Sequence, residues 1–339
     1  MTDLSTTYLG LQLANPLVPS ASPLGAYMDN LRRMEDAGAA AVVLPSLFEE
    51  QLAQESAELD FLLSHGTYGG TEATSFDQGQ FRFSPDAYLK RVRRAKAALG
   101  IPVIGSLNGV SAGGWIDYAL QVERAGADAL ELNMYYLPTD PYLESATIEQ
   151  EYVDVVTEVV RQLHIPVAVK LSPYFTNVAL MARKLDQAGA SGLVLFSRFV
   201  QPDIDLELVQ LENRAALTTD VDPHALRLPL RWIGVLYGRV RANLAASGGV
   251  HAARDVAKLL MVGADVTMMA SALMRRGVEH LSILRDMLRD WMDEHNYPSV
   301  RQLRGCLSQR AAVHPSAYER EHYVRAVAAV RAGVSSRSY

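Results

Sequence analysis

The stretch Arg124-Ala-Gly-Ala-Asp-Ala-Leu-Glu-Leu-Asn133 has the composition of a helix end that runs directly into a buried strand. Gly126 suits the position just after a helix, where the backbone often turns with a positive φ angle. The apolar run over residues 129–133 predicts a short strand inside a parallel sheet. The stretch therefore predicts one helix-to-strand step of an α/β fold.

The same junction recurs along the chain, at residues 36–39, 187–190 and 261–265. It precedes four of the eight strands that we predict, which lie at residues 16–21, 40–44, 102–106, 129–133, 166–170, 192–197, 243–247 and 265–271. Eight β/α units with a shared junction predict a closed (β/α)8 TIM barrel. An open, doubly wound sheet is the alternative, because periodicity does not show closure.

We predict that residues 1–339 form one barrel domain. Residues 6–18 contain two short β-like segments around Gly10, which we expect to form a hairpin at one end of the barrel. Long segments follow strands two, four and six, which places them on the carboxyl face, where barrels keep their active sites. The glycine-rich segment 61–82 is typical of a lid. A long helix over 276–296 and two shorter helical segments, ending near residue 331, are expected outside the barrel.

Charge and cysteine content exclude several classes of function. The net charge is −6, so no basic field favours nucleic acid or an anionic membrane. Cys306 is the only cysteine, which excludes disulfides and cysteine metal clusters, and the histidines show no metal-like spacing. No run reaches the roughly 20 apolar residues that span a membrane, and the first residues do not resemble a signal peptide. We expect a cytoplasmic protein.

The predicted strand ends carry mostly small or hydrogen-bonding residues, which leaves room for a flat polar ring system. They are Ser20, Ala21, Ser22, Ser46, Asn108, Asn133, Lys170, Ser197, Ser247, Gly248, Gly249, Ala270 and Ser271. Lys170 is unusual, since lysine is rarely buried without an anionic partner. It could form a Schiff base, stabilise an anionic cofactor or substrate, or belong to a structural ion pair.

The turn Ser247-Gly248-Gly249 precedes a helix predicted to start near Ala252. Glycine lets a backbone approach an anion closely, and a helix start presents free N–H groups to it. Barrels commonly hold phosphate in the loops after strands seven and eight. The sequence favours a phosphate site here over a plain glycine-rich turn.

Several motifs, in order over residues 8–307, resemble the FMN-dependent dihydroorotate dehydrogenases, class 1 in particular. They are Asn15-Pro-Leu-Val-Pro-Ser-Ala-Ser22, Val167-Ala-Val-Lys-Leu-Ser-Pro-Tyr-Phe175, Ala246-Ser-Gly-Gly-Val250, Gly263-Ala-Asp-Val-Thr-Met-Met-Ala-Ser-Ala-Leu273 and Tyr297-Pro-Ser-Val-Arg-Gln-Leu-Arg-Gly305. The resemblance implies an FMN-binding barrel, an enzyme that oxidises dihydroorotate to orotate in pyrimidine biosynthesis, and a homodimer. The electron acceptor stays open.

The resemblance also implies a role for individual residues. Lys170 would lie beside the N1/O2 edge of the flavin ring, where a cation stabilises reduced flavin. Ala21 and Ser22 would back the ring, and Ser46 and Asn133 would hydrogen-bond it. The phosphate would lie against Gly248, Gly249, Ala270 and Ser271.

The departures from the family fall on the substrate side. Pro45 stands where the family has a lysine, Tyr136 where class 1 has its cysteine base, and Phe196 where an asparagine contacts orotate. The loop before the second helix has no convincing match around residues 74–76. Tyrosine is a poor base near neutral pH but a serviceable proton donor. We therefore hypothesise that Tyr136 or Tyr135 donates a proton during reduction of an activated C=C bond; the alternative is that both fill a loop core.

The sequence thus predicts an FMN oxidoreductase acting on a CH–CH or C=C bond. Three alternatives stay open. The first is an ene-reductase-like enzyme on another small conjugated substrate, the second a Schiff-base lyase that uses Lys170, and the third a flavin-carrying accessory protein without turnover.

Overall fold

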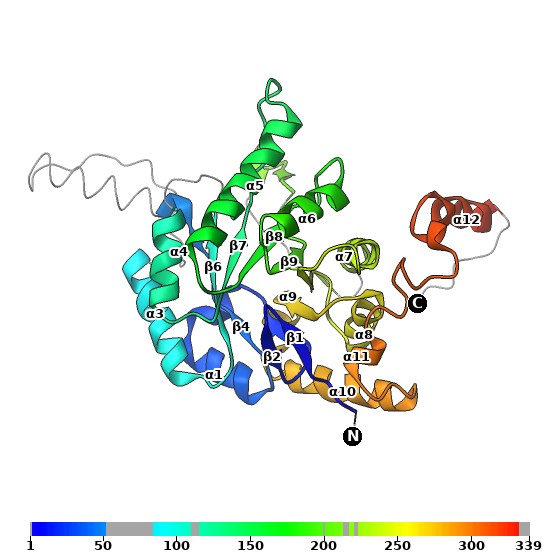
Figure 1. The fold of residues 1–339 in the computed structure, drawn as a ribbon, viewed down its shortest axis with the longest axis horizontal. Helices are drawn as coiled ribbons and strands as arrows, with labels where there is room; N and C mark the ends of the chain where they lie inside the picture. Colours follow the sequence, from blue (N-terminus) through cyan, green and yellow to red (C-terminus); the bar gives the residue numbers. More distant parts are fainter. Residues whose placement is uncertain are drawn as a thin grey trace, which may run out of the picture.

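The computed structural model describes residues 2–51, 84–109, 115–198, 201–212, 217–219 and 223–331, and its centre is a ring of parallel strands (Figure 1). The strands are β3 (Leu17–Pro19), β4 (Val42–Val43), β6 (Val103–Asn108), β7 (Ala129–Asn133), β8 (Val167–Leu171), β9 (Gly192–Leu195), β12 (Asn243–Ser247) and β13 (Val266–Met269). They pair in the order β3-β13-β12-β9-β8-β7-β6-β4. The Ala40 N–H donates to the Leu17 carbonyl at 3.0 Å and draws the two ends of the ring together. The predicted (β/α)8 barrel is confirmed, and the open sheet is excluded.

Helices cover the outside of the barrel between successive strands. They are α1 (Met28–Asp36), α3 (Pro85–Ala98), α4 (Trp115–Arg124), α5 (Ser145–Gln162), α6 (Val178–Gln187), α7 (Pro223–Leu236) and α8 (Ala253–Val262). After β13 the chain forms α9 (Ser271–Arg276), α10 (His280–Glu294), α11 (Val300–Leu303) and α12 (Arg320–Arg331), with α12 set apart from the barrel (Figure 1). Short 3-10 helices occupy Pro23–Ala26 and Pro315–Tyr318. Among the described residues, no helix is both long and apolar enough to cross a membrane.

The predicted helix-to-strand junctions form as expected. Gly126 has a φ of +96°, and Gly263 has a φ of +121°. Beyond each glycine the next N–H reaches back over the helix end, and Ala264 donates to the Leu259 carbonyl at 3.0 Å. This bond satisfies a carbonyl that the last helical turn leaves free. The junction therefore ends each helix and aims the chain into the sheet.

Three boundaries differ from the sequence prediction, and one predicted segment is not described. The helix expected over 276–296 is interrupted at Gly277, whose φ of +84° ends α9 before α10 begins. Strand eight ends at Met269, because Ser271 already begins α9. The N-cap of α1 is Tyr27, one residue before the helix, and not Asp29. The lid expected over 61–82 lies outside the described residues.

The hairpin of β1 (Thr6–Tyr8) and β2 (Leu11–Leu13) closes the amino end of the barrel (Figure 1). Tyr8 and Leu9 are buried among the inward-facing apolar side chains of the strands. A Cβ atom on Gly192 would lie only 2.6 Å from the Leu9 Cδ2, so glycine lets the hairpin pack here without a shift of the Leu9 side chain. The expected hairpin plug is confirmed.

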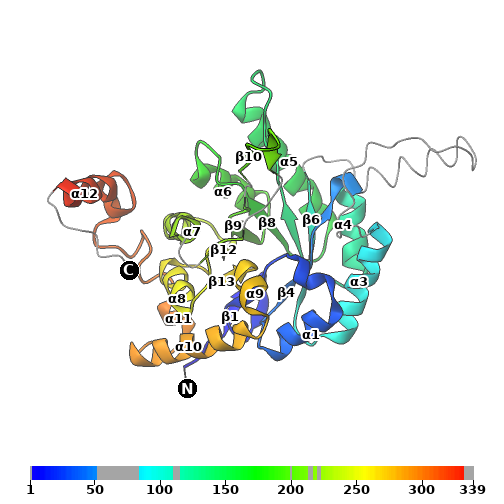
Figure 2. The same ribbon diagram turned by 180° about the vertical axis from the view of Figure 1, so that it is seen from behind.

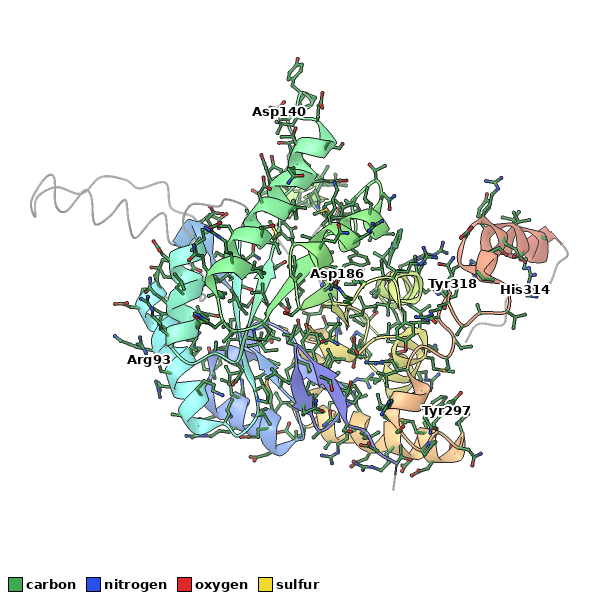
Figure 3. All side chains as sticks on the ribbon, in the orientation of Figure 1. Arg93, Asp140, Asp186, Tyr297, His314 and Tyr318 are labelled. Atoms are coloured by element: carbon green, nitrogen blue, oxygen red, sulfur yellow. The ribbon has the colours of Figure 1, made fainter. Side chains whose placement is uncertain are left out.

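The carboxyl side of the barrel carries the long connections. The loop after β9 contains a second hairpin, β10 (Asp203–Asp205) and β11 (Gln210–Glu212), which lies near the outer end of α5 (Figure 2). Asp140, in the loop after β7, lies at the tip of the projection that leads into α5 (Figure 3). Two of the three long connections predicted at the mouth, those after β7 and β9, are therefore found there, and most of the third lies outside the described residues.

Candidate active site at the carboxyl ends of the strands

Side chains of a strand alternate between the barrel interior and the helix layer. On β7, Ala129 belongs to the interior apolar cluster, whereas Leu130 and Leu132 pack with the helices. Glu131 and Asn133 share the inward orientation of Ala129. The interior is apolar toward the amino ends of the strands and polar toward their carboxyl ends. We call the polar layer beneath the mouth, which includes Ser20, Ser106, Glu131, Asn133 and Lys170, the chamber.

Lys170 is the centre of this chamber. Its side chain is 9% exposed, and its Nζ donates to the Ser20 Oγ at 3.2 Å and to the Glu131 Oε1 at 3.4 Å. Ser20 follows β3, which lies opposite β8 in the ring. The ammonium group therefore bridges the chamber from one wall to the other. The structure shows that Lys170 has an anionic partner, which the sequence left open.

A second polar contact joins the loop after β4 to β6, where the Ser46 and Ser106 hydroxyls lie 2.7 Å apart. Pro45 has no N–H. On the edge of β6 that faces β4, pairing stops at Ile104 and resumes at Leu107 with the short strand β5 (Leu47–Phe48), whereas the pairing of β6 with β7 is continuous. The Tyr88 hydroxyl fills the interruption: it accepts from the Ser106 N–H at 2.7 Å and donates to the Ser106 carbonyl at 3.0 Å. This tyrosine replaces a missing piece of sheet and supports the wall that carries Ser46.

Asn133 and Ser197 form a third contact, with the serine hydroxyl donating to the asparagine Oδ1 at 2.5 Å. Asn108 lies beside Asn133 in the register of β6 and β7. Three predicted site residues, from β6, β7 and the end of β9, are therefore neighbours at the mouth.

Two predicted residues on the substrate side pack toward the helix layer. Phe196 is 5% exposed and belongs to the outer apolar cluster, and Tyr136 is half-buried against the same cluster. The Tyr152 hydroxyl hydrogen-bonds the Tyr136 backbone, while burial raises the pKa of Tyr152 to about 12. Tyr152 also makes an edge contact with Phe175, with ring centroids 5.4 Å apart. The packing anchors the Tyr136 loop, and a catalytic part for its hydroxyl stays a prediction.

The turn after β12 keeps part of what was predicted for an anion site. At the start of α8, the His251 and Ala252 N–H groups are not free, because they donate to the Asp255 carboxylate at 3.1 and 2.9 Å, so the glycine turn is what is left for an anion. Gly248 and Gly249 have φ angles of +108° and +70°. A Cβ on Gly249 would lie 2.5 Å from the Leu226 nitrogen, so the turn packs closely on the start of α7. Among the described residues, no backbone carbonyl accepts from the N–H groups of these two glycines. Two adjacent N–H donors therefore stay available at this turn.

The neighbouring loop after β13 carries Ala270 and Ser271 at the start of α9. The Ser271 Oγ accepts from the Thr218 N–H at 3.3 Å, and the Thr218 hydroxyl lies 3.0 Å from the His251 Nε2. Arg275 donates to the Thr218 carbonyl at 3.1 Å. The segment 217–219 thus ties the loops after β12 and β13 to each other, a contact that no local sequence signal indicated.

The chamber combines a buried cation with neutral hydrogen-bonding groups. Lys170 is the buried cation at the mouth, and serine hydroxyls and asparagine amides lie near it. The glycine N–H groups lie at the turn after β12, the strand that pairs with β9. Ala21 packs against the interior cluster at the rim, and Ser22 is buried beside it. Within the described ranges, no group of histidine, cysteine or carboxylate side chains could hold a metal ion.

Sequence reasoning missed Glu131 and Ser106 as members of the site. Both are essentially inaccessible to solvent, at 1% and 0% exposure. Glu131 lies two residues before Asn133, so strand alternation places it on the same inward face. A carboxylate in a buried strand beside a buried lysine on the next strand was the signal that could have indicated the pair.

Fold and chamber together define a (β/α)8-barrel protein with its ligand site at the carboxyl ends of the strands. The family model described as Dihydroorotate dehydrogenase matches residues 84–292, more than half of the chain. The chain therefore belongs to the dihydroorotate dehydrogenase family, a family of oxidoreductases that act on CH–CH bonds.

Individual relatives are similar over nearly their whole length. The Dihydroorotate dehydrogenase B (NAD(+)) catalytic subunit of Thermoplasma acidophilum is 24% identical, over 90% of this chain and 99% of the relative. The Putative dihydroorotate dehydrogenase A (fumarate) of Aeropyrum pernix is 26% identical, over 89% and 97%. The chloroplastic Dihydropyrimidine dehydrogenase (NADP(+)) of Arabidopsis thaliana is 22% identical, over 94% and 80%.

Proposed function

We propose that this chain binds FMN in the chamber and transfers hydride to or from a CH–CH unit of a small conjugated substrate. One observation carries the proposal: Lys170 is buried at the mouth, and its ammonium is held between Ser20 and Glu131. A fixed cation of this kind suits the electron-rich edge of a flavin, where negative charge develops on reduction.

The remaining parts of the chamber match the remaining parts of FMN. Ala21 and Ser22 would lie behind the ring, while Ser46, Asn133 and Ser197 would bind its polar edge. The phosphate would lie between the loops after β12 and β13, against residues 247–249, 270 and 271. When bound, FMN supplies hydride transfer to and from carbon. The side chains of the chain orient the substrate, exclude water and move the proton.

Dihydroorotate, oxidised to orotate as in pyrimidine biosynthesis, is the first substrate to test, because relatives carry that activity in their names. Asn108 and Asn133 are neighbours at the mouth and supply amide groups that a pyrimidine ring could use. Pro45, Tyr136 and Phe196 replace polar groups of the family pattern. A site without such hydrogen-bond partners distinguishes poorly between a polar ring and an analogue that lacks the polar groups.

A second candidate follows from Phe196, which stands in the place of an orotate-binding asparagine and is packed away in the outer cluster. The loss favours a less polar substrate with an activated C=C bond. In such a reduction, the hydride would reach one carbon, and the Tyr136 or Tyr135 hydroxyl would donate the proton to the other. Tyr136→Phe should then slow turnover of the true substrate, whereas unchanged turnover would exclude the hydroxyl as proton donor.

The geometry argues against the Schiff-base lyase. A lysine nucleophile needs a free amine, which is favoured by apolar surroundings or by a neighbouring cation. Lys170 instead contacts the Glu131 carboxylate, and an ammonium in such a pair lacks the free electron pair that attacks a carbonyl.

The test begins with the purified protein and FMN. We expect a yellow protein whose flavin absorbance stays with the chain during gel filtration. Anaerobic dihydroorotate should then bleach the flavin; bleaching by reductant but not by dihydroorotate would favour the second candidate. A loaded protein that turns over neither dihydroorotate nor enones would indicate an accessory flavoprotein. A protein that takes up no FMN would refute the proposal.

We also propose a homodimer and a separate electron partner. The hairpin β10–β11 exposes Leu206 and Val209, at 82% and 85%, which suits a surface that is covered in an assembly. One relative is named a catalytic subunit that uses NAD(+), so a second protein is a reasonable electron partner. Light scattering of the purified chain tests the dimer. A cytoplasmic location stays a prediction from the sequence.

A further inference from the structure

Glu131 is buried in the barrel wall and interacts with Lys170 through one oxygen only. Its side chain is 1% exposed, and its Oε1 lies 3.4 Å from the Lys170 Nζ. Its Oε2 is buried and has no hydrogen-bond partner among the described residues. Buried carboxylates usually gather several donors, which spread their charge. In the described part of the chain, the lysine is the one donor that offsets this charge.

The negative charge of Glu131 also acts on a second buried group inside the barrel. Tyr8, from the hairpin plug, is fully buried and lies on the interior side of the strands. Burial, together with the charge of Glu131, raises the pKa of Tyr8 well above its usual range. Glu131 therefore contributes an electrostatic field inside the barrel, in addition to one contact.

The contacts of Lys170 also fix a direction. A lysine ammonium has three N–H donors in a tetrahedral arrangement. Ser20, after β3 across the barrel, accepts one of them at 3.2 Å, and Glu131, on the neighbouring strand β7, accepts a second at 3.4 Å. Once two donors are held, the third can point in only one direction. The register neighbour of Lys170 on β7 is Asn133, and Glu131 lies two residues earlier, further from the mouth, which leaves the mouth side for the third N–H.

We propose that Glu131 is a positioning residue that, together with Ser20, aims the third N–H of Lys170 at the ligand and offsets part of the lysine charge. This inference rests on the proposed function, because the ligand is the flavin. With the carboxylate in place, the ammonium stabilises negative charge on reduced flavin less than a lone cation would. Glu131 thereby lowers the reduction potential of bound FMN and keeps it ready to return electrons to an acceptor.

The experiment measures the reduction potential of bound FMN in the wild type and in three variants. Glu131→Gln keeps the size of the side chain and removes its charge. We expect it to raise the affinity for reduced relative to oxidised FMN at least tenfold, which for a two-electron couple equals about 30 mV. Lys170→Met should shift the same ratio in the opposite direction. Ser20→Ala changes no charge, and we expect less than a threefold change of the ratio.

A purely structural role for Glu131 would lower thermal stability and leave the potential where it is in the wild type. The inference would be overturned if the ratio of the affinities for reduced and oxidised FMN in Glu131→Gln stayed within threefold of the wild type. A shift of this ratio in the same direction as in Lys170→Met would also overturn it. Should Glu131→Gln fail to fold, Glu131→Asp retains the charge one methylene further away. Glu131→Asp should then raise the ratio of the affinities for reduced and oxidised FMN by more than twofold but less than tenfold. An unchanged ratio would contradict the inference.

The outcome separates this inference from the proposed function. A wild-type chain that takes up no FMN would overturn both. A wild-type chain that binds FMN, together with a Glu131→Gln variant of unchanged potential, would overturn this inference alone.

Discussion

Lys170 and Ser20 meet across the width of the barrel, with the ammonium 3.2 Å from the serine hydroxyl, although 150 positions separate them in the chain. One residue ends β8, and the other follows β3 on the opposite side of the ring. The contact exists only because the ring closes. Barrel closure and the assembly of the polar chamber are therefore the same event.

Lys170→Met should destabilise the protein strongly. The substitution leaves the Glu131 carboxylate buried without its cation, and breaking a buried pair in this way costs about 3–5 kcal/mol. Adding Glu131→Gln should recover much of the loss, since both charges are then gone. Urea unfolding measures both effects. Lys184→Met is the control, because its pair with Glu149 is partly exposed and should matter by less than about 1 kcal/mol.

Tyr88→Phe should cost about 1–3 kcal/mol of unfolding free energy. The hydroxyl serves both the N–H and the carbonyl of Ser106, and neither group has another route to water in the buried wall. Thermal unfolding measures the loss. Tyr323→Phe, at a tyrosine that is 64% exposed, is the control and should change little. Equal stability of the two variants would contradict the sheet-replacing role of Tyr88.

Gly192→Ala should displace the hairpin plug. The new methyl group would lie 2.6 Å from the Leu9 Cδ2 and 3.4 Å from the Tyr8 ring, an overpacking that costs about 1–3 kcal/mol. A double-mutant cycle with Leu9→Ala checks the cause, because the smaller side chain makes room. The glycine substitution should cost less in the Leu9→Ala background, and strictly additive effects would count against this packing.

Glu123→Gln should weaken the dependence of stability on acid pH. The Glu123 carboxylate accepts from the His164 and Ile165 N–H groups, at 2.7 and 2.9 Å, where the chain enters β8. Burial raises its pKa, but these hydrogen bonds outweigh burial and lower the pKa below the usual value of 4.5. The folded pKa is depressed, so the stabilisation is present above about pH 4.5 and is lost as the pH falls through the folded pKa.

Unfolding between pH 7 and pH 3 tests this prediction. The wild type should lose more stability than Glu123→Gln over that range, because only the wild type must protonate the carboxylate. Glu151→Gln, at an exposed position of α5, serves as the matched control and should follow the wild type. Identical pH profiles for all three proteins would contradict the role of Glu123.

Gly249→Ala should release FMN if the proposed phosphate site is correct. The backbone has a φ of +70° there, and the added Cβ would lie 2.5 Å from the Leu226 nitrogen, so the turn must move. We expect at least a tenfold faster loss of FMN on dilution, measured by the rise in flavin fluorescence. Gly100→Ala, whose Cβ meets only a carboxylate oxygen at 3.3 Å, should retain FMN as the wild type does.

The sequence by itself determined the β/α units, because their signals are local, whereas closure of the ring was left to the structure. Each junction glycine, such as Gly126 or Gly263, acts within one helix end, and each apolar run acts within one strand. The strand-end position of Lys170 followed from the same local pattern. The succession of helices and strands along the chain therefore needed no knowledge of distant contacts. Boundaries failed, as at Gly277, where a positive φ separates α9 from α10, and the hairpin β10–β11 was not predicted.

Only the tertiary structure decided the partners of these residues. Glu131, Ser20 and Lys170 come from three strands, and their meeting depends on ring closure and on register. The Tyr88 hydroxyl, from helix α3, hydrogen-bonds the backbone of Ser106 where strand pairing is missing. Phe196 packs among the residues of the helix layer. Such contacts join residues that are far apart in the chain and depend on their positions in space. Local sequence patterns therefore do not predict them.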